Sequence, residues 1–408
     1  MFHNTGAPAS GPMRALAWCL PVAAWLVYGP LGAKYAAWML ATTLAGVAVH
    51  RSARGWRGLL NPASALLLAF SGWMGMSAAW SPADWTLIGT HAWMYALPLS
   101  TLVIAAACTP QLAMRTLAQF VWASAAVGGL WFLHARGLLP DWKVLGSTIN
   151  ASGNQRIASS LLLALGAGLA LWLSSGKQVT PIQRAAFAIA AVLAVAGLTA
   201  QDRRTGMVLL PLLLLAWAVS APRSWVTKGV LVTAVVAAAA GAWLGSDTVR
   251  ARFAEGRAEL QAYTPEGAVA SSWGQRARML EQTVQMVQEQ PLRGHGLGSW
   301  EVLWTERMQP GTRLSGNTTP HNDYLLVAAQ GGLSAALLLL AWLLALLVRA
   351  WRAGPMGVPA LMAWLTLASI ALANAALRDA KFALPLLLLA GVASALVPRS
   401  DSASSVPR

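Results

Sequence analysis

Five charged side chains in this sequence have the chemistry to hold a phosphate group and to move a proton. Four of them are arginines, whose guanidinium groups bind phosphate and pyrophosphate through paired, charge-assisted hydrogen bonds. The fifth is a histidine, which titrates near neutral pH and can act as a general base. Together they would suit a lipid-linked pyrophosphate donor and a hydroxyl acceptor. The five residues are Arg203, Arg204, Arg276, Arg278 and His321.

Each of these residues also has a purely structural interpretation. An arginine beside a membrane span often anchors the span by extending its charged end toward water. A single histidine at a helix start is more often a cap or an interface residue. Two settings favour chemistry: Arg204 opens a helix before Thr205-Gly206 and an apolar run, and His321 lies between Pro320 and the polar residues Asn322-Asp323-Tyr324.

The composition is that of a membrane protein. Of the 408 residues, 57% are hydrophobic and only 11% are charged, whereas a soluble domain has about 25% charged residues. This excludes a soluble enzyme, a disordered chain and a disulfide-stapled secreted domain. The two cysteines, Cys19 and Cys108, lie far apart in or beside apolar runs, so we expect neither a disulfide nor a metal site from them.

Apolar runs of spanning or near-spanning length occur twelve times along the chain, and each span needs about 20 residues. They predict an all-α integral membrane protein with transmembrane helices 1–9 in residues 1–245, one large loop in 246–320 and helices 10–12 in 321–400. Residues 401–408 are expected to form a short cytoplasmic tail. The runs are 14–29, 31–49, 58–80, 84–108, 115–136, 156–175, 182–200, 204–221, 225–245, 322–349, 357–377 and 379–397.

The charges between these runs predict the orientation. Basic residues follow the even-numbered spans, and acidic residues follow the odd-numbered ones. By the positive-inside rule, both termini are then cytoplasmic, and the loop of residues 246–320 is periplasmic. The net charge of +15 is therefore better explained by topology than by nucleic-acid binding. All five candidate residues fall on the outer side, and residues 276–290 predict an amphipathic helix that Pro291 ends.

Two further patterns limit the chemistry. The glycine-rich stretch 294–298 predicts a tight turn rather than a nucleotide-binding loop, because no strand precedes it. We interpret His91 and His134 as structural residues and His295 as incidental to the turn. The sequence has no closely spaced aspartate pair and no cluster of histidine, cysteine and aspartate with metal-ligand spacing. We therefore expect a mechanism without a metal ion or cofactor.

Several segments, taken in order, resemble the O-antigen ligase / O-antigen polymerase superfamily. The stretch from Pro291 to Trp300, then Pro320-His-Asn-Asp-Tyr-Leu325 and Gly331-Gly332, resembles that family's long loop and the span after it. Upstream, Arg204-Thr205-Gly206, Gln275–Leu280 and Asn154–Ala158 resemble its shorter motifs, although Leu280 stands where the family usually has tryptophan. The matching segments run from about residue 146 to residue 332.

The resemblance implies a glycosyltransferase of the bacterial inner membrane whose donor is a glycan on undecaprenyl pyrophosphate. In our interpretation His321 is the base, Arg204 and Arg276 bind the pyrophosphate, and Arg203 and Arg278 are reserves for that role. Asn322 or Asp379 would orient the imidazole, and Asn154 supports the site.

Within the superfamily, the sequence is most like an O-antigen ligase, whose acceptor is lipid A–core. A repeat-unit polymerase and a protein O-oligosaccharyltransferase are the alternatives from the same superfamily. A twelve-span transporter and a scaffolding membrane protein come from other classes. The transporter fits less well, because we see no internal repeat and few charges at mid-span depth. The scaffolding protein fits least, because it would leave the outer arginines and His321 unexplained.

Overall fold

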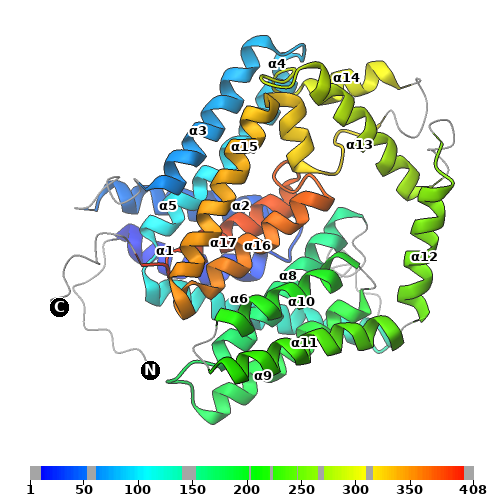
Figure 1. Ribbon diagram of the computed structural model, residues 1–408. Helices are drawn as coiled ribbons and strands as arrows, with labels where there is room; N and C mark the ends of the chain where they lie inside the picture. The colour runs from blue at the N-terminus through cyan, green and yellow to red at the C-terminus, as the bar shows by residue number, and fades with distance from the viewer. Residues whose placement is uncertain are drawn as a thin grey trace.

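The computed structural model describes residues 11–52, 61–139, 153–201, 204–220, 224–245, 247–264, 271–308 and 316–398, and these residues form helices joined by turns, with no strand among them (Figure 1). The predicted all-α class is therefore confirmed for the described part of the chain. The predicted tail, residues 401–408, lies outside it.

Within the described residues, every apolar run identified in the sequence is mostly helical. Some of the runs consist of two or more short helices in series. The helices are α1 (Gly11–Leu26), α2 (Leu31–His50), α3 (Pro62–Met76) with η2 (Ser77–Trp80), α4 (Trp85–Ala96) with η3 (Leu97–Leu99) and α5 (Ser100–Ala107), α6 (Pro110–Ala135), α8 (Asn154–Ser174), α9 (Pro181–Ala200), α10 (Arg204–Ser220), α11 (Trp225–Gly245), α15 (Asp323–Arg352), η5 (Gly354–Gly357) with α16 (Val358–Ala373), and α17 (Ala380–Ser394).

Seven helical stretches in the described residues are long and apolar enough to cross a membrane. Three apolar helices are shorter, namely Thr205–Ser220, Trp225–Gly241 and Ala380–Ser394. Twelve crossings, the division at residues 245 and 320, and the periplasmic position of the loop stay predictions. The seven long stretches are Pro62–Trp80, Trp85–Ala107, Pro110–Ala135, Asn154–Ser174, Pro181–Ala200, Asp323–Arg352 and Gly354–Ala373.

Small residues let the helices of the bundle approach closely. Gly128 on α6 and Gly197 on α9 lie against each other, and a Cβ atom on either glycine would collide with the backbone of the other helix. Gly206 on α10 meets the backbone of Ser160 on α8 in the same way. Such contacts are typical of helix pairs in membranes, where packing drives association. They hold α10 against α8 close to the residue where α10 begins.

The long polar segment between α11 and α15 contains three helices, α12 (Asp247–Gln261), α13 (Ser272–Glu289) and α14 (Ser299–Arg307). In Figure 1, α12 and α13 form an arch along one side of the bundle, and α14 lies above the start of α15. The amphipathic helix predicted at 276–290 is present as α13. It starts four residues earlier, because the side chain of Ser271 accepts a hydrogen bond from the Gly274 amide.

The polar segment has its own apolar core, which packs on α15. Met279 and Met286 supply the inner face of α13, whereas Val284 is 40% exposed. This core joins α13 and α14 to the first turns of α15 and to Ala375, in the turn after α16. Its buried members are Met279, Met286, Trp300, Trp304, Met308, Leu326, Ala329 and Ala375.

The turn predicted at residues 294–298 is present, and it docks on a kink in α15. Gly294, Gly296 and Gly298 all have positive φ, and the kink is at Gly332, where φ is 75° and ψ is 179°. The backbone N–H groups of His295 and Gly296 donate to the carbonyls of Ala329 and Gln330 at 2.9 and 2.8 Å. The turn is therefore fixed to α15 by its backbone. Because the turn directly follows α13, it also fixes the C-terminal end of that helix beside α15.

Candidate functional site

His321 lies at the end of the polar segment, directly before α15. It is half-buried, and its φ of 54° is positive, which no other non-glycine residue among those described shows. A side chain in this region costs of order 1 kcal/mol or more and persists where the surroundings enforce it. Asn322 follows as the N-cap of α15, with its side chain accepting a hydrogen bond from the Leu325 amide at 3.0 Å.

Four consecutive residues, 321–324, attach the start of α15 to the end of α16 and to the turn between α16 and α17. We call residues 374–379 the α16–α17 turn. The Nδ1 atom of His321 lies 3.1 Å from Oδ1 of Asn374, and Asn322 donates to the carbonyl of Leu372 at 3.1 Å. The carboxylate of Asp323, fully buried, accepts from the amide of Leu377 at 2.8 Å, and the Tyr324 hydroxyl donates to the Ala368 carbonyl at 3.0 Å.

Polar contacts continue from the imidazole into the bundle. The Asn374 amide nitrogen faces Oδ1 of Asn154 at 3.5 Å, and the Asn154 amide nitrogen donates to a carboxylate oxygen of Asp379 at 2.7 Å. The other carboxylate oxygen of Asp379 caps α17 by accepting from the Lys381 amide. The structure thus brings together three residues predicted for the site, His321, Asn154 and Asp379. It joins them through Asn374, which sequence reasoning missed.

The surroundings of His321 favour its neutral form. Burial lowers the pKa of His321, and the positive charge of Arg276 lowers it further. The hydrogen bond to Asn374 and the negative charge of Asp379 act in the opposite direction, and the net shift is downward. A histidine with a lowered pKa is unprotonated at neutral pH, which is the state that a general base needs.

The two arginines of α13 have different settings. Arg276 is partly buried and close enough to His321 for its charge to act on the imidazole. Arg278 is paired with Glu281 one turn later, with 3.0 Å between Nη1 and Oε2. The Tyr263 hydroxyl donates to that same oxygen at 2.7 Å, and the two hydrogen bonds lower the pKa of Glu281. Arg276 therefore fits the site better than Arg278.

The remaining arginines are only partly described. Helix α10 begins at Arg204, as the sequence predicts, and the placement of its side chain lies outside what the structure describes. Arg203 lies outside the described residues altogether. Gly206 holds the start of α10 against Ser160 of α8, the helix that begins at Asn154. Asn322, which we expected to orient the imidazole, caps α15 instead. Asp379 acts on His321 through its charge rather than by a hydrogen bond.

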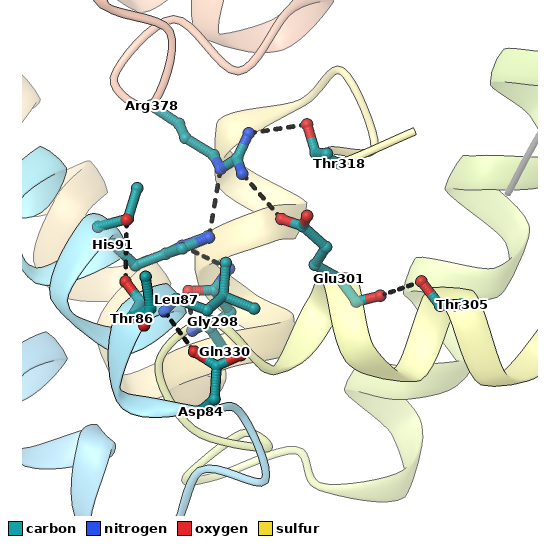
Figure 2. A network of polar contacts seen from close by, with 11 residues as sticks. Asp84, Thr86, Leu87, His91, Gly298, Glu301, Thr305, Thr318, Gln330 and Arg378 are labelled. Atoms are coloured by element: carbon teal, nitrogen blue, oxygen red, sulfur yellow. Dashed lines mark hydrogen bonds and ion pairs between the residues drawn. The ribbon is translucent and has the colours of Figure 1, made fainter. Parts of the chain in front are cut away.

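A second polar network starts from the same α16–α17 turn and centres on Arg378 (Figure 2). Its guanidinium donates to Glu301 of α14 and to Thr318, both at 2.9 Å. Its Nε atom faces Nε2 of His91 on α4 at 3.3 Å. Burial raises the pKa of Glu301, and the charge of Arg378 opposes that shift. Arg378 thus joins the α16–α17 turn to the polar segment at two points, Glu301 of α14 and Thr318, which is three residues before His321.

His91 has a fixed side chain at each of its ring nitrogens, as expected for a structural residue. Its Nδ1 lies 3.3 Å from the amide nitrogen of Gln330, whose Oε1 accepts from the Gly298 amide at 3.1 Å. His295 also has a structural contact, with its Nε2 atom 2.8 Å from the Met286 carbonyl. Among the residues that the structure describes, no group of three or more histidine, cysteine, aspartate or glutamate side chains could hold a metal ion. A metal-independent mechanism stays a prediction.

The comparison with known families matches one stretch of the chain to a family model described as O-antigen ligase. Residues 189–340 match the O-antigen ligase family. The resemblance inferred from the sequence motifs is therefore confirmed at the level of the O-antigen ligase/polymerase superfamily. A search of curated proteins found no match to this chain.

The O-antigen ligase match covers the described helices from most of α9 to the first half of α15. It includes Arg204, Arg276, the glycine turn and His321, but Asn154, Asn374 and Asp379 lie outside it. The two residues that sequence reasoning missed, Asn374 and Arg378, lie on the α16–α17 turn. A charged pair, Arg378-Asp379, between two apolar runs was the one available signal. Asn374 left no such signal, because its partner is 53 positions away.

Proposed function

We propose that this protein is an O-antigen ligase that moves a glycan from undecaprenyl pyrophosphate to a sugar hydroxyl of lipid A–core. The family match supports this class of reaction. The observation that carries the proposal is the setting of His321, whose Nδ1 lies against Asn374 and whose pKa is lowered by burial and by the charge of Arg276. This is a neutral base beside a cation, which suits proton removal next to a phosphate group.

In the proposed reaction, the acceptor hydroxyl gives its proton to the imidazole of His321 while its oxygen attacks the anomeric carbon of the glycan. A new glycosidic bond forms with inversion, and the bond from that carbon to the pyrophosphate oxygen breaks. Undecaprenyl pyrophosphate leaves with the bonding electron pair. Arg276 and Arg204 would stabilise the charge that builds on the leaving group, with Arg203 and Arg278 as reserves. No metal ion or cofactor takes part.

Three polar residues would support this step. Asp379 supplies a negative charge that favours the imidazolium formed during proton transfer, and Asn154 holds its carboxylate. Asn322 fixes the start of α15 next to His321. We infer that the protein lies in the bacterial inner membrane, with both termini cytoplasmic and the site facing the periplasm. Both lipid substrates would then reach the site from the bilayer.

The decisive experiment is a reconstituted assay. Purified protein in lipid vesicles is given undecaprenyl-pyrophosphate-linked glycan and lipid A–core, and the products are separated by size. A ligase extends lipid A–core and releases undecaprenyl pyrophosphate, and it continues to do so in excess EDTA. Longer glycans on undecaprenyl pyrophosphate without any lipid A–core product would instead identify a polymerase. Glycan on serine or threonine of an added protein would identify an oligosaccharyltransferase.

The orientation is tested with single cysteines in a variant that lacks Cys19 and Cys108. Ala262→Cys, beyond α12, should react with a membrane-impermeant thiol reagent added from the periplasmic side. Ala53→Cys, after the second apolar run, should react only after the membrane is made permeable. The reverse pattern would place the proposed site in the wrong compartment.

A further inference from the structure

We propose that Asn374 is a positioning residue that holds the proton of neutral His321 on Nδ1 and so leaves Nε2 as the atom that accepts the proton of the substrate hydroxyl. The role of Nε2 in transfer rests on the proposed function. The control of the tautomer by Asn374 does not, because it follows from hydrogen-bond geometry.

The orientation of the Asn374 amide is fixed by its own backbone neighbour. The N–H of Ala375 lies 2.9 Å from Oδ1 of Asn374. A backbone N–H only donates, so the group facing it must be the amide oxygen. The amide nitrogen then faces Oδ1 of Asn154 at 3.5 Å, which is also a donor facing an acceptor. The flipped amide would place an NH₂ group against the Ala375 N–H, and two donors would oppose each other.

This orientation determines which nitrogen of His321 carries the proton. The same Oδ1 atom lies 3.1 Å from Nδ1 of His321, and an oxygen of this kind only accepts. Nδ1 must therefore donate, so the neutral imidazole carries its proton there. Nε2 then has a lone pair, and no hydrogen bond joins it to any residue within the described ranges.

Burial makes this arrangement costly to disturb. Asn374 is only 2% exposed, so its oxygen has little access to water if the imidazole turns away. The oxygen would then keep only the Ala375 N–H, and the proton on Nδ1 of His321 would lose its acceptor. The helix attachments of Asn322, Asp323 and Tyr324 on the same junction further restrict the position of the ring.

A neutral partner also suits a base that must release its proton again. The charged groups that act on His321 are Arg276, which lowers its pKa, and Asp379, which raises it. Asp379 is separated from the ring by Asn154 and Asn374, so its charge reaches the imidazole without a direct carboxylate contact. Asn374 thus gives orientation without the large rise in pKa that a carboxylate in its place would cause.

The first test reads the tautomer itself. Nitrogen NMR of protein with ¹⁵N-labelled histidine distinguishes Nδ1–H from Nε2–H, and a His321→Gln spectrum assigns the His321 signals. We expect Nδ1–H in the unmodified protein and in Asn374→Asp, and a mixture or the other tautomer in Asn374→Ala. Asn322→Ala is the matched control: it removes an amide one residue away whose hydrogen bonds go to the backbone of Leu372 and Leu325, and the tautomer should stay Nδ1–H.

The second test reads glycan transfer. Asn374→Ala should lower the single-turnover rate by about 10²-fold or more, as loss of the correct histidine tautomer does in hydrolases, and leave donor affinity unchanged. Asn374→Asp should recover most of the rate. The acidic limb of its pH–rate profile should move to higher pH, because a carboxylate raises the pKa of the imidazole and the base must be neutral.

The two tests separate the proposals. Nδ1–H retained in Asn374→Ala, together with an unchanged rate, overturns the positioning role even if transfer depends on His321. If the unmodified protein transfers no glycan, the proposed function fails, and the NMR result alone decides the role of Asn374. If Asn374→Ala fails to fold, the spectra of the unmodified protein and of Asn374→Asp still test the positioning role. A signal from Nε2–H of His321 in either spectrum would overturn that role.

Discussion

His91 and His321 both contact side chains of the α16–α17 turn, yet their surroundings differ in kind. His91 is fully buried on α4, and both of its ring nitrogens face donors, Arg378 and the amide of Gln330 (Figure 2). His321 is half-buried, with Nδ1 against an acceptor and Nε2 outside any hydrogen bond with the described residues. A neutral imidazole can accept at only one of its nitrogens, and a second proton on His91 would face the Arg378 guanidinium or the Gln330 amide group. His91 is therefore suited to structure and His321 to proton transfer.

The largest expected effect comes from removing each histidine in turn. His321→Ala should lower the transfer rate by about 10²–10⁴-fold, the usual contribution of a general base, and leave donor binding largely intact. His91→Ala should instead lower the thermal stability and keep most of the transfer rate per folded molecule. Single-turnover rates, donor affinity and thermal unfolding are measured for both variants. Near-normal transfer by His321→Ala would contradict the assignment of the base.

A similar contrast exists within α13. Arg276→Ala should weaken donor binding as well as the rate, because the pyrophosphate is charged before and during the transition state. Arg204→Ala should behave in the same way, and lysine should not fully rescue either position if the contact is bidentate. Arg278→Ala is the matched control on the same helix, and its smaller effect would reflect the pairing with Glu281. Donor affinity equal to that of the unmodified protein in Arg276→Ala would exclude the phosphate role.

The pH dependence of transfer should follow the two charges that act on His321. The base is active when neutral, and its pKa is lowered, so the rate should be lost only as pH falls below the usual histidine value of about 6.5. Asp379→Asn removes a charge that raises the pKa, so the acidic limb should move to lower pH. Arg276→Gln removes a charge that lowers it, so that limb should move to higher pH. If the acidic limbs of the two pH–rate profiles shift in the opposite directions, the group that titrates is not His321.

The smallest effect concerns the network around His91. Glu301→Gln keeps the shape of the side chain and replaces the ion pair with Arg378 by a neutral hydrogen bond. We expect a loss of roughly 1 kcal/mol in the free energy of unfolding and little change in the pH profile of transfer. Thermal or denaturant unfolding in detergent measures the first, and the reconstituted assay the second. A shifted acidic limb would mean that this network also acts on His321.

The elements that position the site could be predicted because their signals are local. The length of each apolar run predicted a helix. Pro320 and Asn322 indicated the start of α15, because a proline and a capping side chain restrict the backbone there. The turn at 294–298 followed from its glycines. The pairing of Arg278 with Glu281 could also have been predicted, since residues three apart share a helix face.

The interior of the site could not be predicted, because its contacts join distant parts of the chain. Asn154 and Asp379 were expected as supporting residues, but nothing in the sequence indicates that their side chains meet across 225 positions. Asn374 lies near the end of the apolar run 357–377, where an asparagine commonly ends a helix, so its contact with His321 left no pattern in the sequence. Only the packing of α8, α15 and the α16–α17 turn brings these side chains together.

The docking of the glycine turn on α15 has a consequence for how a long sugar chain reaches His321. The amides of His295, Gly296 and Leu333 are bonded between the turn and the kinked helix, so lifting the segment from α15 would break all three at once. In a hydrogen-exchange experiment these amides should exchange late, together, and at a rate unaffected by substrate. In the proposed reaction, the turn would then be a fixed surface beside the glycan rather than a lid that opens to admit it.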